Sequence, residues 1–444
     1  MLNPPLSLLS DDLLAYIVEH AAKLQFGDRF ENLNNLSLVD RAFTQTCQRY
    51  IFRDLRLGNS RKASKKLKNL RAILDDKPTF AHRFRRVELA VELMAWIFND
   101  PIFNSILQLL ANSPVPPYAL RLSPMVGDSW ILDDPILVVR WFTQSFFSQS
   151  LRVLHLDNCK NIPLPIFLIS PGLREVFLDV VGTAEKSYDQ YSDDLCCGRE
   201  APLLEVLNYR NSHSLLKQMI TPPLRFSTPV VLWSKLLVLT LSPQDKEGIA
   251  CLQPILDAAC DTLQELYLSK GDGGAPDEAQ QPSLAELVNL SNLPSLRVFA
   301  LYTIIKCKKP RKAPRPAVLH DINTVLGTIP ESNKITNLWF DFYIVGRHPF
   351  RACFEQDWVG IFNEIIRISD GKALELEFQM SVAVGPLDAE FHTPGANELY
   401  THITEKSASL SDCPKICTHF WNPTFLGCGL DRFPSGEVRS RCRQ

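Results

Sequence analysis

A pattern close to L-x-x-L-x-L recurs eleven times between residues 52 and 378, and it constrains the fold more than any other feature of the chain. Successive matches begin 22 to 39 residues apart. Because side chains alternate along a strand, each match predicts a short strand with one buried face. The matches are residues 52–57, 84–89, 117–122, 151–156, 173–178, 204–209, 236–241, 263–268, 296–301, 335–340 and 373–378.

Between the matches, apolar side chains recur about every 3.6 residues instead of every two residues, and this spacing predicts a helix. The predicted helices are residues 101–111, 135–142, 249–260, 284–290, 322–329 and 358–368. One strand and one helix cannot bury their apolar faces alone, so the units must stack on one another. Over residues 52–383 we therefore predict an irregular α/β solenoid of leucine-rich repeats, with a curved parallel sheet inside and helices outside. The longest intervals predict loops at 183–200, 270–282 and 306–316.

The sequence of residues 1–57 predicts a small helical domain. The first repeat follows this domain directly, without a linker. Ser10 can cap a helix that begins at Asp11. A polar loop over residues 25–31 and a second helical pattern over residues 33–43 follow, and Asp40 begins a third helix that ends near Ile51. Three short helices have little core of their own, so this unit is expected to need a partner or the repeats to cover its apolar faces.

Three segments near the N-terminus resemble an F-box, especially those of the large fungal, basidiomycete-type F-box families. They read Leu8-Leu9-Ser-Asp-Asp-Leu13-Leu14-Ala-Tyr-Ile17-Val18, then Leu36-Ser-Leu38-Val39-Asp-Arg41-Ala-Phe43, and then Tyr50-Ile51-Phe52-Arg53-Asp-Leu55. The chain departs from that family at two positions. Ser10 stands where the family usually has proline, and Asp12 stands where it usually has glutamate.

The resemblance implies a substrate-recognition adaptor of an SCF-type (Skp1-cullin-F-box) ubiquitin ligase. In that family the F-box binds the linker protein Skp1, which docks on a cullin. The matching positions are Leu9, Leu13, Ile17, Leu36, Leu38, Val39 and Phe43. One alternative is that these side chains pack only against one another and the first repeat. Another is a repeat scaffold that binds a partner without recruiting a ligase.

Alternate residues of the predicted strands point away from the helices and form candidate binding surfaces. The substrate-binding residues predicted on this concave face are His155, Asp157, Phe177, Asp179, Tyr267, Tyr302, Trp339 and Asp341. Aromatic residues are enriched at binding hot spots, and the acids among them suit a protein with basic residues. The alternative is that each aromatic ring packs against its neighbour in the adjacent repeat.

No motif for a nucleophile, a catalytic zinc or a phosphate loop occurs, so we predict a non-catalytic protein without a cofactor. Cys159 fits the asparagine or cysteine position of the repeat. In residues 384–444, which predict an irregular tail, Cys413, Cys417, His419 and Cys428 could supply four zinc ligands. Their spacing matches no standard zinc knuckle, so scattered reduced thiols are the favoured reading and no metal site is predicted.

The net charge of −2 argues against a nucleic-acid partner. The basic cluster of residues 308–315 reads as a solvated loop, with a nuclear import signal or anion patch as the alternative. The first residues lack the basic and apolar regions of a secretory signal, and no stretch is long enough to span a bilayer. We therefore expect no membrane partner, a cytoplasmic or nuclear location, and reduced cysteines.

Overall fold

The computed structural model of this 444-residue chain describes most of its residues. The described ranges are 10–23, 29–58, 63–91, 100–124, 130–131, 134–144, 147–183, 199–223, 226, 229–242, 246–270, 284–306, 318–345, 351–383, 389–420 and 424–426. They group into two compact units. Unit 1 is residues 1–204 and 214–232, and unit 2 is residues 205–213 and 233–444.

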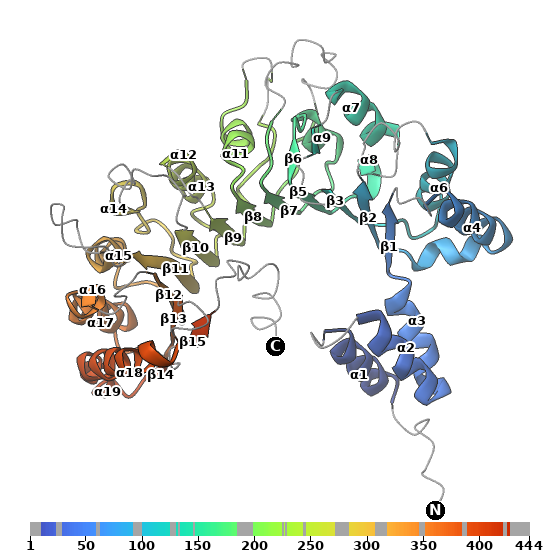
Figure 1. The fold of residues 1–444 in the computed structure, drawn as a ribbon. Coiled ribbons are helices and arrows are strands. Elements are labelled where there is room, and N and C mark those ends of the chain that lie inside the picture. The colour runs from blue at the N-terminus through green and yellow to red at the C-terminus, as the bar shows by residue number, and fades with distance from the viewer. Residues whose placement is uncertain are drawn as a thin grey trace, which may run out of the picture. The chain divides into compact units, whose positions relative to one another are not determined.

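Unit 1 begins with three helices, which we call the helical head: α1 (Asp11–Lys23), α2 (Arg29–Val39) and α3 (Arg41–Ile51) (Figure 1). The Ser10 side chain accepts a hydrogen bond from the Leu13 amide at 3.3 Å, and Asp40 accepts one from the Ala42 amide at 2.8 Å. The predicted cap at Ser10 is therefore confirmed, and Asp40 caps the third helix where that helix was predicted to begin. Helix α2 begins earlier than predicted, inside the expected loop of residues 25–31.

The strands of unit 1 follow the predicted pattern. They are β1 (Asp54–Gly58), β2 (Arg86–Val91), β3 (Ala119–Pro124), β5 (Val153–Asp157) and β7 (Glu175–Asp179), paired in parallel in that order. A separate short pair joins β4 (Trp130–Ile131) to β6 (Cys159–Lys160). Each of the five strands β1, β2, β3, β5 and β7 begins two residues inside its predicted match.

Helices connect these strands and lie on one side of them (Figure 1). They are α4 (Ala63–Asp76), the 3-10 helix η2 (Pro78–Arg83), α6 (Pro101–Ala111), α7 (Pro135–Gln144), α8 (Phe147–Ser150) and α9 (Pro165–Ile169), with most of α11 (His213–Ile220) also in this unit. The predicted helix over residues 101–111 is confirmed to the residue.

Unit 2 repeats the arrangement. Its strands β8 (Val206–Arg210), β9 (Val238–Ser242), β10 (Glu265–Lys270), β11 (Val298–Lys306), β12 (Asn337–Val345) and β13 (Leu374–Ala383) are paired in parallel in chain order. The helices are α12 (Lys246–Ala250), α13 (Leu252–Ala258), α14 (Leu284–Leu287), α15 (Val318–Gly327), α16 (Arg351–Phe354) and α17 (Trp358–Ser369). The helix predicted over residues 249–260 is split in two, because Pro254 cannot donate a backbone hydrogen bond and fits only near a helix start.

Burial alternates along the strands as the repeat pattern requires. Leu154 and Leu156 of β5 are fully buried, whereas His155 between them is half-buried. Leu239 and Leu241 of β9 are likewise buried on either side of Thr240. Both units therefore have a parallel sheet with an apolar face under the helices, as expected for an α/β solenoid-like arrangement.

The segment after residue 383 differs from the expected irregular tail. It contains α18 (Ala389–Lys406), α19 (Ala408–Ser411) and β14 (Ile416–Phe420), and β14 pairs in parallel with β13. The short β15 (Thr424–Leu426) also pairs with β13. The sequence hides α18 because Pro394 and Gly395 lie inside it and weaken its helical signal. Burial of Ala396, Leu399 and Ile403 stabilises the helix in the folded chain.

Candidate functional site

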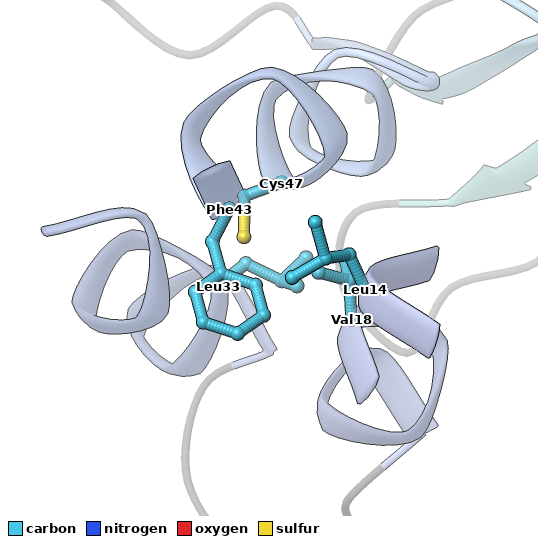
Figure 2. Close-up of a cluster of buried hydrophobic side chains, with 5 residues drawn as sticks. All are labelled: Leu14, Val18, Leu33, Phe43 and Cys47. Carbon is cyan, nitrogen blue, oxygen red and sulfur yellow. The ribbon is translucent and has the colours of Figure 1, made fainter. Parts of the chain in front are cut away.

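The helical head has a complete small core. Leu14 and Val18 of α1, Leu33 of α2, and Phe43 and Cys47 of α3 are at most 5% exposed and point toward one another (Figure 2). Burial raises the pKa of the Cys47 thiol, as expected for a side chain that acts as a small apolar group. The head therefore buries its own apolar centre.

Outside that core, four large apolar side chains of the head stay exposed. Leu13 is 43% exposed, Tyr16 59%, Leu38 84% and Val39 66%. The described residues contain eight exposed large apolar side chains in all, so half of them belong to this small domain. Two of the four lie on α1 and two at the end of α2, and exposed apolar side chains of this kind are suited to contact another molecule. We call these four residues the head patch.

The structure describes six of the seven predicted head-contact residues, and they fall into three groups. Leu13, Leu38 and Val39 are in the head patch, whereas Ile17 and Leu36 are partly buried against the core. Phe43 is only 3% exposed, because its ring fills the centre between the helices, so the surface of the head does not offer it to a partner. Leu9 lies outside the described residues.

Sequence reasoning missed Tyr16. Tyr16 follows Leu13 by three residues, so the two side chains lie on the same side of α1. This spacing could have added Tyr16 to the predicted contact residues. Its ring stacks on His20, with centroids 5.5 Å apart.

The second candidate surface is the sheet face away from the helices, which we call the open face. In unit 1, strand pairing places five residues of this face in register as a ladder: Arg56, Glu88, Arg121, His155 and Phe177. In unit 2 the corresponding ladder is Asn208, Thr240, Tyr267, Ala300, Trp339 and Glu377, continued by His419. The eight predicted substrate-binding residues thus form two sets of four, one in each unit.

Ion pairs and ring stacking occupy much of the open face of unit 1. Arg121 lies 2.6 Å from Asp157 in an ion pair, and Arg56 lies 2.8 Å from Glu88. The rings of His155 and Phe177 are stacked, with centroids 3.9 Å apart. The alternative of packing between neighbours therefore holds for Phe177. Asp157 is already neutralised by Arg121, which weakens the case for a basic partner at this residue.

In unit 2 the open face keeps two half-buried aromatic rings, Trp339 and Tyr302. Burial raises the pKa of Tyr302, and the nearby carboxylate of Asp341 raises it further, so the phenol stays protonated at neutral pH. Tyr267 differs from the expectation of an exposed ring. It is 7% exposed, and its hydroxyl donates to Glu265 at 2.9 Å, so the ring leans along its own strand.

Cys159 has the structural role that its repeat position predicts. It is fully buried, and its Sγ lies 3.1 Å from the carbonyl oxygen of Asp157. Burial strongly raises the pKa of its thiol, and the charge of Asp157 adds to the effect. A neutral, inaccessible thiol is a poor nucleophile, so Cys159 serves the turn after β5.

Among the described residues, no three histidine, cysteine, aspartate or glutamate side chains gather closely enough to hold a metal ion. Cys417 lies 3.4 Å from His419 through Sγ and Nε2, but Cys428 lies outside the described residues. His419 is also 3.9 Å from Glu375.

No protein-family model matches the chain, and no curated protein matches it either. Within the described ranges, every helix is too short or too polar to cross a bilayer.

Proposed function

We propose that this protein is a substrate-recognition adaptor of an SCF-type ubiquitin ligase. In this proposal the F-box-like head binds Skp1, and through it a cullin, while the leucine-rich repeats hold a protein substrate. The observation that carries the proposal is the head patch, because these apolar side chains stay exposed on a domain whose own core is already complete. Skp1 is the partner we propose because Leu13, Leu38 and Val39 occupy positions that match those of an F-box.

The energetics favour a partner over a solvated surface. Burying apolar area contributes about 25 cal/mol per Å², so covering several large side chains supplies several kcal/mol. Leu38 and Val39 are the last two residues of α2. They are the most exposed members of the head patch, followed by Tyr16. Large apolar anchors of this kind carry most of the affinity of a helix-packing interface.

The open faces supply candidate substrate contacts. Trp339 and Tyr302 are the residues that best fit a hot spot, because each combines a large apolar area with a polar group. The proposed adaptor performs no chemistry of its own. It would act by proximity, holding a substrate near a ubiquitin-charged enzyme, in the cytosol or nucleus.

A binding assay with purified Skp1 and the full chain tests the proposal. We expect the wild-type chain to bind, and the double variant Leu13→Asp and Leu38→Asp to bind at least about 100-fold more weakly. The matched control is Ile73→Asp and Val359→Asp, which changes two side chains that are 46% and 42% exposed outside the head. We expect this control to bind like the wild type.

Failure of the intact chain to bind Skp1, where an established F-box protein binds, would overturn the adaptor proposal. The alternative would then be a repeat scaffold that binds its partner without a ligase. Ser10, in place of the proline of the family, is the feature that favours this alternative. Equal binding by the head variant and the wild type would show that Skp1 contacts another surface.

A further inference from the structure

A cavity of about 570 Å³ lies where the helical head meets the first repeats in unit 1. Residues of α3, of η2 and of the segments just before β1, β2 and β3 line it. The lining residues are Gln45, Arg49, Tyr50, Arg53, Thr79, His82, Arg83, Arg85 and Tyr118. We call this cavity the arginine pocket. Its volume is within the range of sites that bind small molecules.

The lining of the pocket is strongly positive. Four of its nine residues are arginines, which stay charged at any physiological pH, and none is aspartate or glutamate. In the part of the chain that the structure describes, no carboxylate forms an ion pair with Arg49, Arg83 or Arg85. The carboxylate of Asp54 acts on Arg53 from outside the lining.

Strand stacking brings two of these arginines together. Arg53 and Arg85 occupy the same position of successive repeats, and the Arg85 amide donates to the Arg53 carbonyl at 2.8 Å. Tyr118 continues the row, since its amide donates to the Arg85 carbonyl at 2.9 Å. Neighbouring strands are about 4.8 Å apart, so the backbones of the two arginines are adjacent, and both side chains line the same pocket. An anion between them would relieve the repulsion of their like charges.

Three of the four arginines are held in place by their neighbours. Arg53 Nη2 donates to the Tyr118 hydroxyl at 3.1 Å, and Arg85 Nη1 donates to the Val115 carbonyl at 3.1 Å. The Arg83 guanidinium lies over the rings of Phe52 and Phe80, 5.9 and 5.3 Å from their centroids. A guanidinium carries five donors, so these contacts leave donors for a ligand.

The pKa of the Tyr118 phenol reflects the positive charge of the pocket. Burial by itself would raise the pKa of this phenol, but the hydrogen bond and charge of Arg53, with a contribution from Arg86, bring it below its ordinary value. Anionic oxygen is therefore stabilised at this position.

We propose that the arginine pocket binds a phosphate monoester. A dianionic phosphate presents three acceptor oxygens, which match the planar forks of several arginines, whereas a single carboxylate would leave most of the positive charge uncompensated. The monoester comes from a small metabolite or from a phosphorylated side chain. This inference does not depend on the proposed binding of Skp1.

Calorimetric titration of the full chain with inorganic phosphate tests the proposal. The test variant is Arg49→Gln with Arg83→Gln, because both side chains are exposed and their loss leaves the core intact. We expect binding to weaken at least about tenfold. The matched control is Arg140→Gln with Lys217→Gln, which removes two exposed positive charges elsewhere in unit 1. We expect the control to bind phosphate like the wild type.

Two pairs of probes distinguish the sources of the phosphate. One is glucose 6-phosphate against glucose, and the other is a phosphoserine peptide against the same peptide without phosphate. Tighter, pocket-dependent binding of either phosphorylated probe supports the proposal and identifies the source.

Three outcomes would overturn the proposal. The first is no binding of phosphate or of either phosphorylated probe by the wild type. The second is equal weakening in the test and control variants, which would indicate attraction to net charge alone. The third is pocket-dependent binding of a glutamate-rich peptide that is as tight as that of the phosphorylated probes.

Discussion

The rings of His155 and Phe177 are parallel to within 5°, and their centroids are 3.9 Å apart on adjacent strands of unit 1. Because each ring covers the other, this pair acts as a single feature of the open face rather than as two separate anchors. The stack also links β5 to β7 beyond their backbone pairing.

A double-mutant cycle measures this link. His155→Ala and Phe177→Ala should destabilise the chain less together than the sum of the single changes, because either change already removes the stack. We expect a coupling energy of about 0.5–1.5 kcal/mol in denaturant unfolding. A coupling energy of zero would show that the two rings contribute independently.

Replacing Val180 with asparagine should stabilise the protein. It follows β7 with φ of +54°, a region that disfavours β-branched side chains, and it is 38% exposed. Asn158 follows β5 at the same repeat position with φ of +50°. We expect Val180→Asn to raise the free energy of unfolding by about 1 kcal/mol, measured by chemical denaturation. The reciprocal change Asn158→Val should lower it, and a loss of stability in Val180→Asn would contradict the strain argument.

Alkaline pH should destabilise the protein through Cys159. The folded-state pKa of this thiol is raised above its ordinary value of 9.0, so the stabilising contribution is complete below pH 9. Above that pH the unfolded chain loses the proton while the folded chain keeps it, and stability falls by about 1.4 kcal/mol per pH unit from this group. Unfolding measured between pH 8 and 10 should show a shallower fall for Cys159→Ala. Identical slopes would contradict the prediction.

The C-terminal elements should protect the edge of the sheet in unit 2. A chain that ends at residue 388 lacks α18 and β14, so the backbone of β13 becomes an unpaired edge that favours aggregation. We expect a lower melting temperature and concentration-dependent light scattering.

Single substitutions in β14 refine this test. Phe420 lies against Phe378 of β13, with ring centroids 5.4 Å apart. Phe420→Ala should cost about 1–2 kcal/mol, whereas the matched change Thr418→Ala, at an exposed position of the same strand, should cost under about 0.5 kcal/mol. Equal effects would show that β14 adds no packing to the edge.

Much of the fold could be predicted because its signals are local. The alternation of Leu154, His155 and Leu156 predicts a strand with one buried face, and the helical spacing of residues 101–111 predicts both ends of α6. The helical head was similarly predictable from its caps at Ser10 and Asp40. In α18 the local signal fails, because Pro394 and Gly395 argue against a helix that only packing stabilises.

The candidate sites were predictable only in part. The ladder residues follow from strand periodicity, so their register could be anticipated. Whether a ladder ring is exposed depends on its neighbours: Tyr267 leans along its strand to Glu265, and Phe177 is covered by His155. Phe43 and Leu38 look equally apolar in sequence, yet one is buried and the other is 84% exposed.

The sequence by itself determined the strand and helix pattern and the residues that alternate on each strand, because these follow from periods of two and about 3.6 residues. Only the tertiary structure decided what these residues contact. Arg53, Arg85 and Tyr118 share one position of the repeat but are more than 30 residues apart in sequence, and strand stacking sets the contacts that join them. Contacts between distant segments depend on how the repeats stack, and the local pattern does not encode that spacing.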